Sequence, residues 1–305
     1  MASGVDNHTA LPEGRDILFL GLGVLGIGTS GPVIAFSAMP VTTLIFWRNL
    51  GGAIVMAPFA WRKKEWHSTL QKKALTLSAF SGVLLALHFI GFFIAMRMTS
   101  VAAGTALTAM QPIFTALFLR FQGHEIPKRA WIGMFIAFLS VLLITGVDLR
   151  ISVRAFTGDM AALVGAALAA GYVLVGSKAQ KNLSTSTYTS VCYLVCAITA
   201  LPISLIAGYN VLHFPAKQWL VLLALIGGAQ ILGHTMFNLS LKRVSPAVVS
   251  LIVFFEVPVS AILAFWWLGQ RPPAGIIPGI IGLLIGCGIF VIKTKISPDS
   301  PKTVD

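Results

Sequence analysis

Charged residues are scarce in this chain. Asp, Glu, Lys and Arg make up 10% of its 305 residues, whereas soluble domains contain about 25%. Hydrophobic residues reach 56% and the mean hydropathy is +0.87, which excludes a soluble globule. Apolar runs of about 18 residues or more recur, and each can cross the roughly 30 Å hydrocarbon core of a bilayer as a helix. Because a membrane β-barrel would instead alternate polar and apolar residues, the sequence predicts an all-α membrane protein.

Cysteines are also few, and nothing indicates a bound cofactor. The three cysteines, Cys192, Cys196 and Cys287, fall within apolar stretches. No His or second Cys pair accompanies Cys192 and Cys196 to complete a metal site, so apolar packing is expected, with no metal and no cofactor. The sequence contains no phosphate-binding loop and no soluble domain, which excludes an ATP-driven pump made from this chain alone.

Acidic residues are outnumbered by basic ones, 10 to 22, and the net charge is +12. Ten membrane helices are expected near residues 17–36, 41–60, 74–96, 101–121, 130–147, 157–178, 187–208, 218–241, 246–267 and 275–292. With a cytoplasmic N-terminus, sixteen basic residues fall in inner segments and five in outer ones, while Arg48 lies within a helix. This bias predicts a multi-pass protein of the inner membrane with both termini in the cytoplasm. The charge thus reflects topology rather than a nucleic-acid partner.

Two halves of the chain repeat each other at a constant separation of 146 residues. Gly82, His88, Arg97, Pro112, Leu117, Gly123, Pro127 and Gly133 recur as Gly228, His234, Arg243, Pro258, Leu263, Gly269, Pro273 and Gly279. Five helices per half is an odd number, so the second half enters the bilayer from the opposite side, as in the inverted repeats of transporters. The expected plan is a flexible tail (1–14), a five-helix repeat (15–147), a connecting loop (148–157), a second five-helix repeat (158–293) and a flexible tail (294–305).

Three motifs resemble the EamA-type transporters of the drug/metabolite transporter superfamily. They are Glu256-Val257-Pro258 with the later Trp267-Leu268-Gly269-Gln270, its counterpart Gln111-Pro112 with Gln122-Gly123-His124-Glu125, and Arg48 early in a helix. The resemblance implies ten helices in two inverted five-helix halves and export of small metabolites, with aromatic amino-acid exporters as the most similar type. One departure is that His124 and Gln270 follow the loop glycines, where the family often has Glu.

Polar side chains within membrane helices are costly and are therefore functional candidates. Glu256 is the carboxylate deepest in an expected helix; it could couple protons or bind a substrate amine, or accept backbone N–H groups freed beside Pro258. Arg48 lies about seven residues into its helix, roughly 10 Å deep. Structural pairing with a carboxylate or with carbonyls is one reading for Arg48, and binding of a substrate carboxylate is the other.

A substrate face is expected where the two repeats meet. His88 and His234 are repeat partners, and Phe92 and Asn238 follow them by four residues, on the same helical faces. Further substrate-binding candidates on the expected cavity helices are Gln111, Tyr172, Gln230, Phe237 and Trp47, in addition to Glu256. The candidates for structural or gating roles are Arg48, Gly28, Ser30, Pro32, Pro112 and Pro258. The small residues of the first helix favour close helix packing; the alternative is a helix that bends or slides, with Gly28 to Pro32 as the candidate segment.

These features predict a secondary transporter in the lipid bilayer that exports amino acids, aromatic ones included, or related small metabolites by alternating access. Protons are a candidate coupling ion. Export of other metabolites or of drugs is the alternative, and a channel is less favoured because rings of charge along a pore are absent from the sequence.

An intramembrane serine protease is a weaker rival, based on Gly28-Thr29-Ser30-Gly31 with His88 or His234 as base. If the chain is a transporter and not an enzyme, Ser30→Ala leaves transport intact, because no nucleophile is needed. Flux into proteoliposomes measures this outcome; loss of transport together with loss of a proteolytic activity would favour the protease.

Overall fold

The computed structural model describes residues 14–145, 152–271 and 276–291, and all regular structure in them is helical. The all-α prediction is therefore confirmed. Eight helical stretches in these residues are long and apolar enough to cross a membrane: 14–36, 41–61, 69–98, 101–121, 153–179, 185–206, 216–240 and 246–268. The expected tails, apart from Gly14, and residues 148–151 of the expected connecting loop lie outside the described residues.

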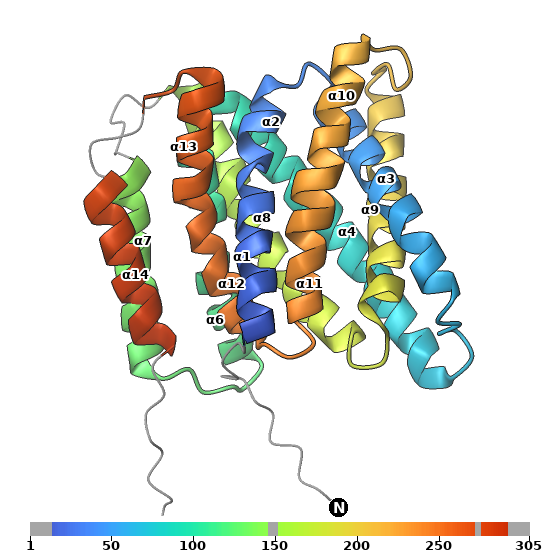
Figure 1. The fold of residues 1–305 in the computed structure, drawn as a ribbon, viewed down its shortest axis with the longest axis horizontal. Coiled ribbons are helices and arrows are strands. Elements are labelled where there is room, and N and C mark those ends of the chain that lie inside the picture. Colours follow the sequence, from blue (N-terminus) through green and yellow to red (C-terminus); the bar gives the residue numbers. More distant parts are fainter. Residues whose placement is uncertain (1–13, 146–151, 272–275, 292–305) are drawn as a thin grey trace, which may run out of the picture.

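The helices begin and end close to the expected positions. They are α1 (Gly14–Gly28), α2 (Ser30–Phe36), α3 (Val41–Trp61), α4 (Thr69–Met98), α5 (Val101–Thr108), α6 (Gln111–Phe121), α7 (Lys128–Thr145), α8 (Val153–Ala179), α9 (Thr185–Ile206), α10 (Ala216–Leu225), the π-helix η1 (Ile226–Thr235), α11 (Met236–Ser240), α12 (Pro246–Ile252), the 3-10 turn η2 (Val253–Phe255), α13 (Glu256–Leu268) and α14 (Ile276–Val291). The start of α1 and the end of α14 lie at the same end of the bundle, the lower end in Figure 1.

Four of the expected spans are present as apolar helical stretches, but each contains a local departure from α-helical geometry. The first breaks at Thr29, the fourth between α5 and α6, the eighth widens into η1, and the ninth narrows into η2. Pro32, Pro112 and Pro258 each lie in the first turn after such a break. A proline is tolerated there because the N–H groups of a first turn have no helical acceptor.

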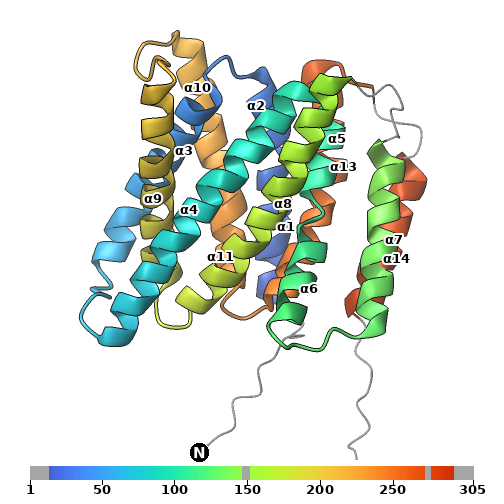
Figure 2. The same cartoon turned by 180° about the vertical axis from the view of Figure 1, so that it is seen from behind.

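The closest helix pairs join the first half of the chain to the second. Helix α4 packs along α8, α3 along α9, α1 along η1 and α11, and α7 along α14. Figures 1 and 2 show α7 and α14 together at one side of the bundle, where they share a hydrophobic cluster with α12, η2 and α13 that is separate from the main core. The halves therefore interleave rather than sit side by side.

Glycine allows several of these pairs to approach through their backbones. A Cβ added to Gly26 would lie 2.5 Å from the nitrogen of Gly233, and one added to Gly91 would lie 2.5 Å from the carbonyl oxygen of Ala161. Helices in a bilayer associate through such close packing, because lipid tails are as apolar as the side chains that they replace. The glycine-rich composition of the helices thus has a packing role at these crossings.

Two arginines that are repeat partners bind different groups at opposite ends of the bundle. Near the start of α1, Arg243 forms an ion pair with the buried Asp16. At the other end, Arg97 donates to the carbonyl oxygens of Ser37 and Met39, which follow α2. The repeat therefore places equivalent cations at both ends, but only their positions match and not their contacts.

The glycine contacts predict opposite effects for two identical substitutions. Gly91→Ala forces α4 away from the backbone of α8 and should lower the free energy of unfolding by about 1–3 kcal/mol. Gly21→Ala, in α1 with nothing within 4 Å of the new Cβ, should raise it by about 0.5–1 kcal/mol. Thermal unfolding in detergent measures both, and a Gly91→Ala protein that unfolds no earlier than the wild type would contradict the packing argument.

Candidate functional site

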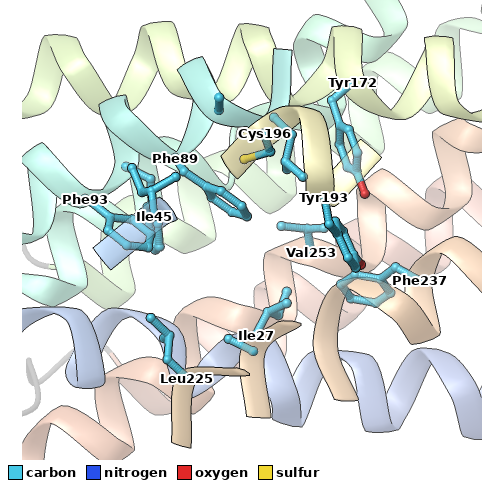
Figure 3. Packing of buried hydrophobic residues seen from close by; sticks show 14 of the residues in the cluster. Ile27, Ile45, Phe89, Phe93, Tyr172, Tyr193, Cys196, Leu225, Phe237 and Val253 are labelled. Carbon is cyan, nitrogen blue, oxygen red and sulfur yellow. The ribbon is translucent and has the colours of Figure 1, made fainter. Parts of the chain in front are cut away.

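A small internal cavity lies where the interrupted helices meet. Its lining residues come from both halves of the chain: Ile27, Ser30, His88, Phe89, Phe92, Thr108, Gln111, Ala169, Tyr172, Val173, His234, Phe237, Asn238, Leu241, Val249, Val253 and Glu256. Figure 3 shows Ile27, Phe89, Tyr172, Phe237 and Val253 converging on this region from different helices. All four interrupted segments contribute to the wall, so the breaks are concentrated around the cavity.

Most of the candidates from the sequence line this one cavity. Eight of the ten substrate-binding candidates do so, namely His88, Phe92, Gln111, Tyr172, His234, Phe237, Asn238 and Glu256, and Ser30 joins them from the gating set. Their roles stay predictions. The apolar part of the wall, such as Phe89 and Val253, could not be selected from the sequence, because nothing in their residue type separates them from other buried residues.

Trp47 and Gln230 are not among the lining residues. The Trp47 indole N–H donates to the carbonyl of Val211 at 2.6 Å and its ring meets Trp219 edge to face, so it anchors the segment after α9. Gln230 is fully buried and bonds to Arg48 and Asn49 of α3. Gln230 lies in η1, which contributes His234 to the wall, whereas α3, which carries Trp47, contributes no lining residue.

The two histidines have different surroundings although they are repeat partners. His88 Nδ1 lies 2.9 Å from the carbonyl oxygen of Gly165 in α8, and its ring stacks on Phe92. Within the described residues His234 makes no such contact with a carbonyl; its ring meets Phe89 and Tyr172 edge to face. His88 therefore bridges two helices, whereas His234 is held by aromatic rings.

A polar pair crosses the cavity wall between α11 and α8. The Asn238 side-chain amide donates to the Tyr172 hydroxyl at 2.7 Å, and both residues are nearly inaccessible to solvent. Asn238 is repeat-equivalent to Phe92, so this hydrogen bond exists in one half only. Gln111 is engaged as well, since its amide donates to the Ser250 hydroxyl at 3.0 Å.

Glu256 is the acidic residue of the cavity wall within the described part of the chain. It is the first residue of α13, directly after the 3-10 turn, and it is buried. The N-terminus of a helix stabilises a negative charge through its free N–H groups and its dipole. Because the Glu256 N–H donates to the carbonyl oxygens of Val253 and Phe254, the dipole of α13 rather than a free N–H of this residue favours the carboxylate.

Arg48 has none of the partners expected for a structural role. It is fully buried in α3, and its Nε donates to Gln230 at 2.7 Å. Its guanidinium carbon lies 4.1 Å from the centroid of the Phe89 ring. Both terminal nitrogens, Nη1 and Nη2, are buried without a hydrogen-bond partner among the described residues. The expectation of pairing with a carboxylate or with carbonyls is therefore wrong for this conformation.

The gating candidates lie at the breaks. Thr29 closes the turn between α1 and α2 by donating its hydroxyl to Gly26 at 2.7 Å. A Cβ at Gly28 would overlap Val259 of α13, so this glycine permits a close crossing. The candidate bending segment is thus the place where the first helix is interrupted, while a gating role for it stays a prediction.

The cavity is too small for a metabolite in this conformation. Its volume is about 50 Å³, enough for roughly three or four water molecules. Sites that enclose small molecules usually measure about 300–1,000 Å³. The conformation is therefore contracted around the cavity.

A second, wider hollow lies at the ends of α6, α8 and α11. It measures about 560 Å³ and is lined by Leu119, Gln122, His124, Leu174, Ser177, Lys178, Lys181, Leu241, Lys242, Arg243, Val244, Ser245 and Pro246. In the views of Figures 1 and 2 these helix ends lie at the lower end of the bundle. Leu241 lines both the hollow and the cavity, so the two spaces adjoin at this side chain.

The chain is similar over most of its length to proteins named as transporters. It is 25% identical to an uncharacterized transporter of Archaeoglobus fulgidus (83% of this chain, 87% of the relative). It is 24% identical to the pseudopaline exporter CntI of Pseudomonas aeruginosa (86% and 89%) and to the uncharacterized transporter YyaM of Bacillus subtilis (81% and 84%).

A solved crystal structure shares the fold at 14% identity, with a TM-score of 0.68 over 90% of this chain and 94% of the other. The EamA-like transporter family matches the chain twice, at residues 15–146 and 156–292. These two matches cover both halves of the repeat and confirm the resemblance drawn from the motifs. The chain belongs to the EamA-like transporter family and is a multi-pass membrane transporter rather than an enzyme.

Proposed function

We propose that this transporter exports amino acids or related small metabolites across the inner membrane by alternating access. The observation that carries the proposal is the cavity built from both halves, whose wall contains eight candidate side chains and every interrupted helix. Helices that break at the substrate site are a recurrent feature of secondary transporters. In this proposal ten helices span the bilayer as two inverted halves, with both termini in the cytoplasm.

The contracted cavity supports a cycle in which it must open to receive a substrate. Because α4 packs along α8 and α7 along α14, rocking one half of the chain against the other would separate the tightest helix pairs. We therefore propose that these cross-half pairs move as units. The breaks in the first, fourth, eighth and ninth segments supply bending points between them.

The cavity wall favours a substrate with an amine and an aromatic or apolar side chain. Glu256 supplies the negative charge for an ammonium group, and Phe92, Tyr172 and Phe237 supply aromatic surface. Offset stacking on such rings contributes about 0.5–1.5 kcal/mol per pair. Other metabolites form the second candidate class, because one relative is named as an exporter of pseudopaline.

Counterflow in proteoliposomes tests the transport mode and the substrate class together. Vesicles loaded with one unlabelled amino acid should accumulate the same labelled amino acid transiently, with a rate that saturates. A channel would show neither behaviour. A panel of aromatic, aliphatic and charged amino acids, measured in parallel, identifies the class, and inactivity on the whole panel would favour the other metabolites.

Glu256→Gln tests whether this carboxylate couples protons. The amide cannot exchange a proton, so a pH gradient should no longer accelerate transport, while counterflow at equal pH should persist with a higher KM, because the charge that binds the ammonium group is lost. Glu125→Gln, which alters an exposed carboxylate after α6, is the matched control and should behave as the wild type. A Glu256→Gln protein that still responds to the gradient would assign Glu256 to another role.

Tyr172→Phe and Tyr188→Phe remove the same atom from two buried tyrosines. Tyr172 lines the cavity, and its hydroxyl accepts a hydrogen bond from Asn238. Tyr188 does not line the cavity, and its hydroxyl lies 2.8 Å from the hydroxyl of Ser81. Both changes should lower the free energy of unfolding by about 0.5–1.5 kcal/mol. Only Tyr172→Phe should change the KM for transport. Equal KM values for the two variants would remove Tyr172 from the substrate site.

A further inference from the structure

Arg48 is the buried charge that the fold leaves unsatisfied. Its side chain is fully inaccessible to solvent, and within the described residues only its Nε has a hydrogen-bond partner, Gln230. The terminal nitrogens have no acceptor, and no ion pair to Arg48 is found among the described residues. A buried guanidinium whose terminal N–H groups have no acceptor destabilises a fold, so its presence points to a partner that binds during function.

The unsatisfied guanidinium adjoins the cavity through Phe89. This ring lines the cavity, and the guanidinium carbon lies 4.1 Å from its centroid. The charge of Arg48 also acts on His88, His234 and Glu256, which all line the same cavity. A rotation of Phe89 as the cavity opens would expose the two terminal nitrogens to a bound molecule.

The hollow at the lower end of the bundle is lined by positively charged residues, and Arg48 carries the same charge. Lys178, Lys181, Lys242 and Arg243 line it, and no acidic residue does so within the described residues. Basic walls concentrate anions and speed their association. Because Leu241 lines both spaces, an anion in this hollow is one side chain away from the cavity.

We infer that Arg48 is the receptor for a carboxylate of the transported molecule, which reaches it from the basic hollow past Leu241. The two terminal nitrogens of a guanidinium form a planar fork that matches the two oxygens of a carboxylate. With Glu256 on the cavity wall, the site would hold a molecule by its carboxylate and its ammonium group. This inference rests on the proposed export of amino-acid-like compounds and names the charged group that selects them.

The first measurement compares two probes that differ in charge. Phenylacetate carries the carboxylate, and phenylacetamide is its neutral counterpart of nearly equal shape. Phenylacetate should raise the thermal unfolding midpoint of the purified protein and phenylacetamide should not. Arg48→Met should lose this response, whereas Lys63→Gln, which removes an exposed cation after the same helix, should keep it.

The second measurement separates a binding role from a structural one. Without ligand, Arg48→Met should unfold at the wild-type midpoint or above it, because a buried unpaired charge is replaced by an apolar chain of similar length. Its KM for phenylalanine should nevertheless rise more than about tenfold, and Arg48→Lys should retain part of the affinity. A lower midpoint with an unchanged KM would make Arg48 a structural residue and overturn the inference.

The outcomes distinguish this inference from the proposed function. If phenylalanine is transported equally by the wild type and Arg48→Met, export of amino acids stands and the carboxylate site falls. If no amino acid is transported but phenylacetate stabilises the protein only when Arg48 is present, the carboxylate site stands and amino-acid export falls. An equal response to phenylacetate and phenylacetamide, or no response to either, overturns the carboxylate site.

Discussion

Backbone contact between helices at glycine is the constraint on which the remaining structure depends. Because lipid tails are as apolar as the side chains, no hydrophobic driving force brings the helices together. They are held together mainly by close packing and by hydrogen bonds between them. At Gly26, Gly91 and Gly286 the facing helix comes so near that even a methyl group would collide with its backbone. These crossings set the spacing at which His88 can reach the carbonyl of Gly165 and at which the cavity remains small.

The positions of the helices could be predicted from the sequence, but their interruptions only in part. Hydropathy and charge locate a span because the bilayer has a defined thickness and polarity. A break at Thr29 or a π-helix at Ile226–Thr235 changes neither the hydropathy nor the charge of its segment. Pro32, Pro112 and Pro258 did mark three of the four interruptions, since each follows a break within one turn. For η1 no proline is present in the segment, and the widening depends on packing against α1.

The candidate site was largely predictable because polar side chains in a bilayer are costly and therefore few. His88, Asn238 and Glu256 could be selected on residue type and repeat position alone, and they line one cavity. Arg48 and Gln230 show the limit of that reasoning. Each was placed on a suitable helix, yet only the tertiary structure reveals that Gln230 binds Arg48 and that two nitrogens of Arg48 lack any acceptor.

The pairing of helices across the two halves also bears on how the protein is made. Helices α1, α3, α4 and α7 are synthesised first, but their main packing partners are η1 with α11, α9, α8 and α14. The growing chain therefore holds its first helices in the bilayer with glycine faces open to lipid until the later ones arrive. Each half finds most of its closest packing partners in the other half, so one half inserted alone would lack them.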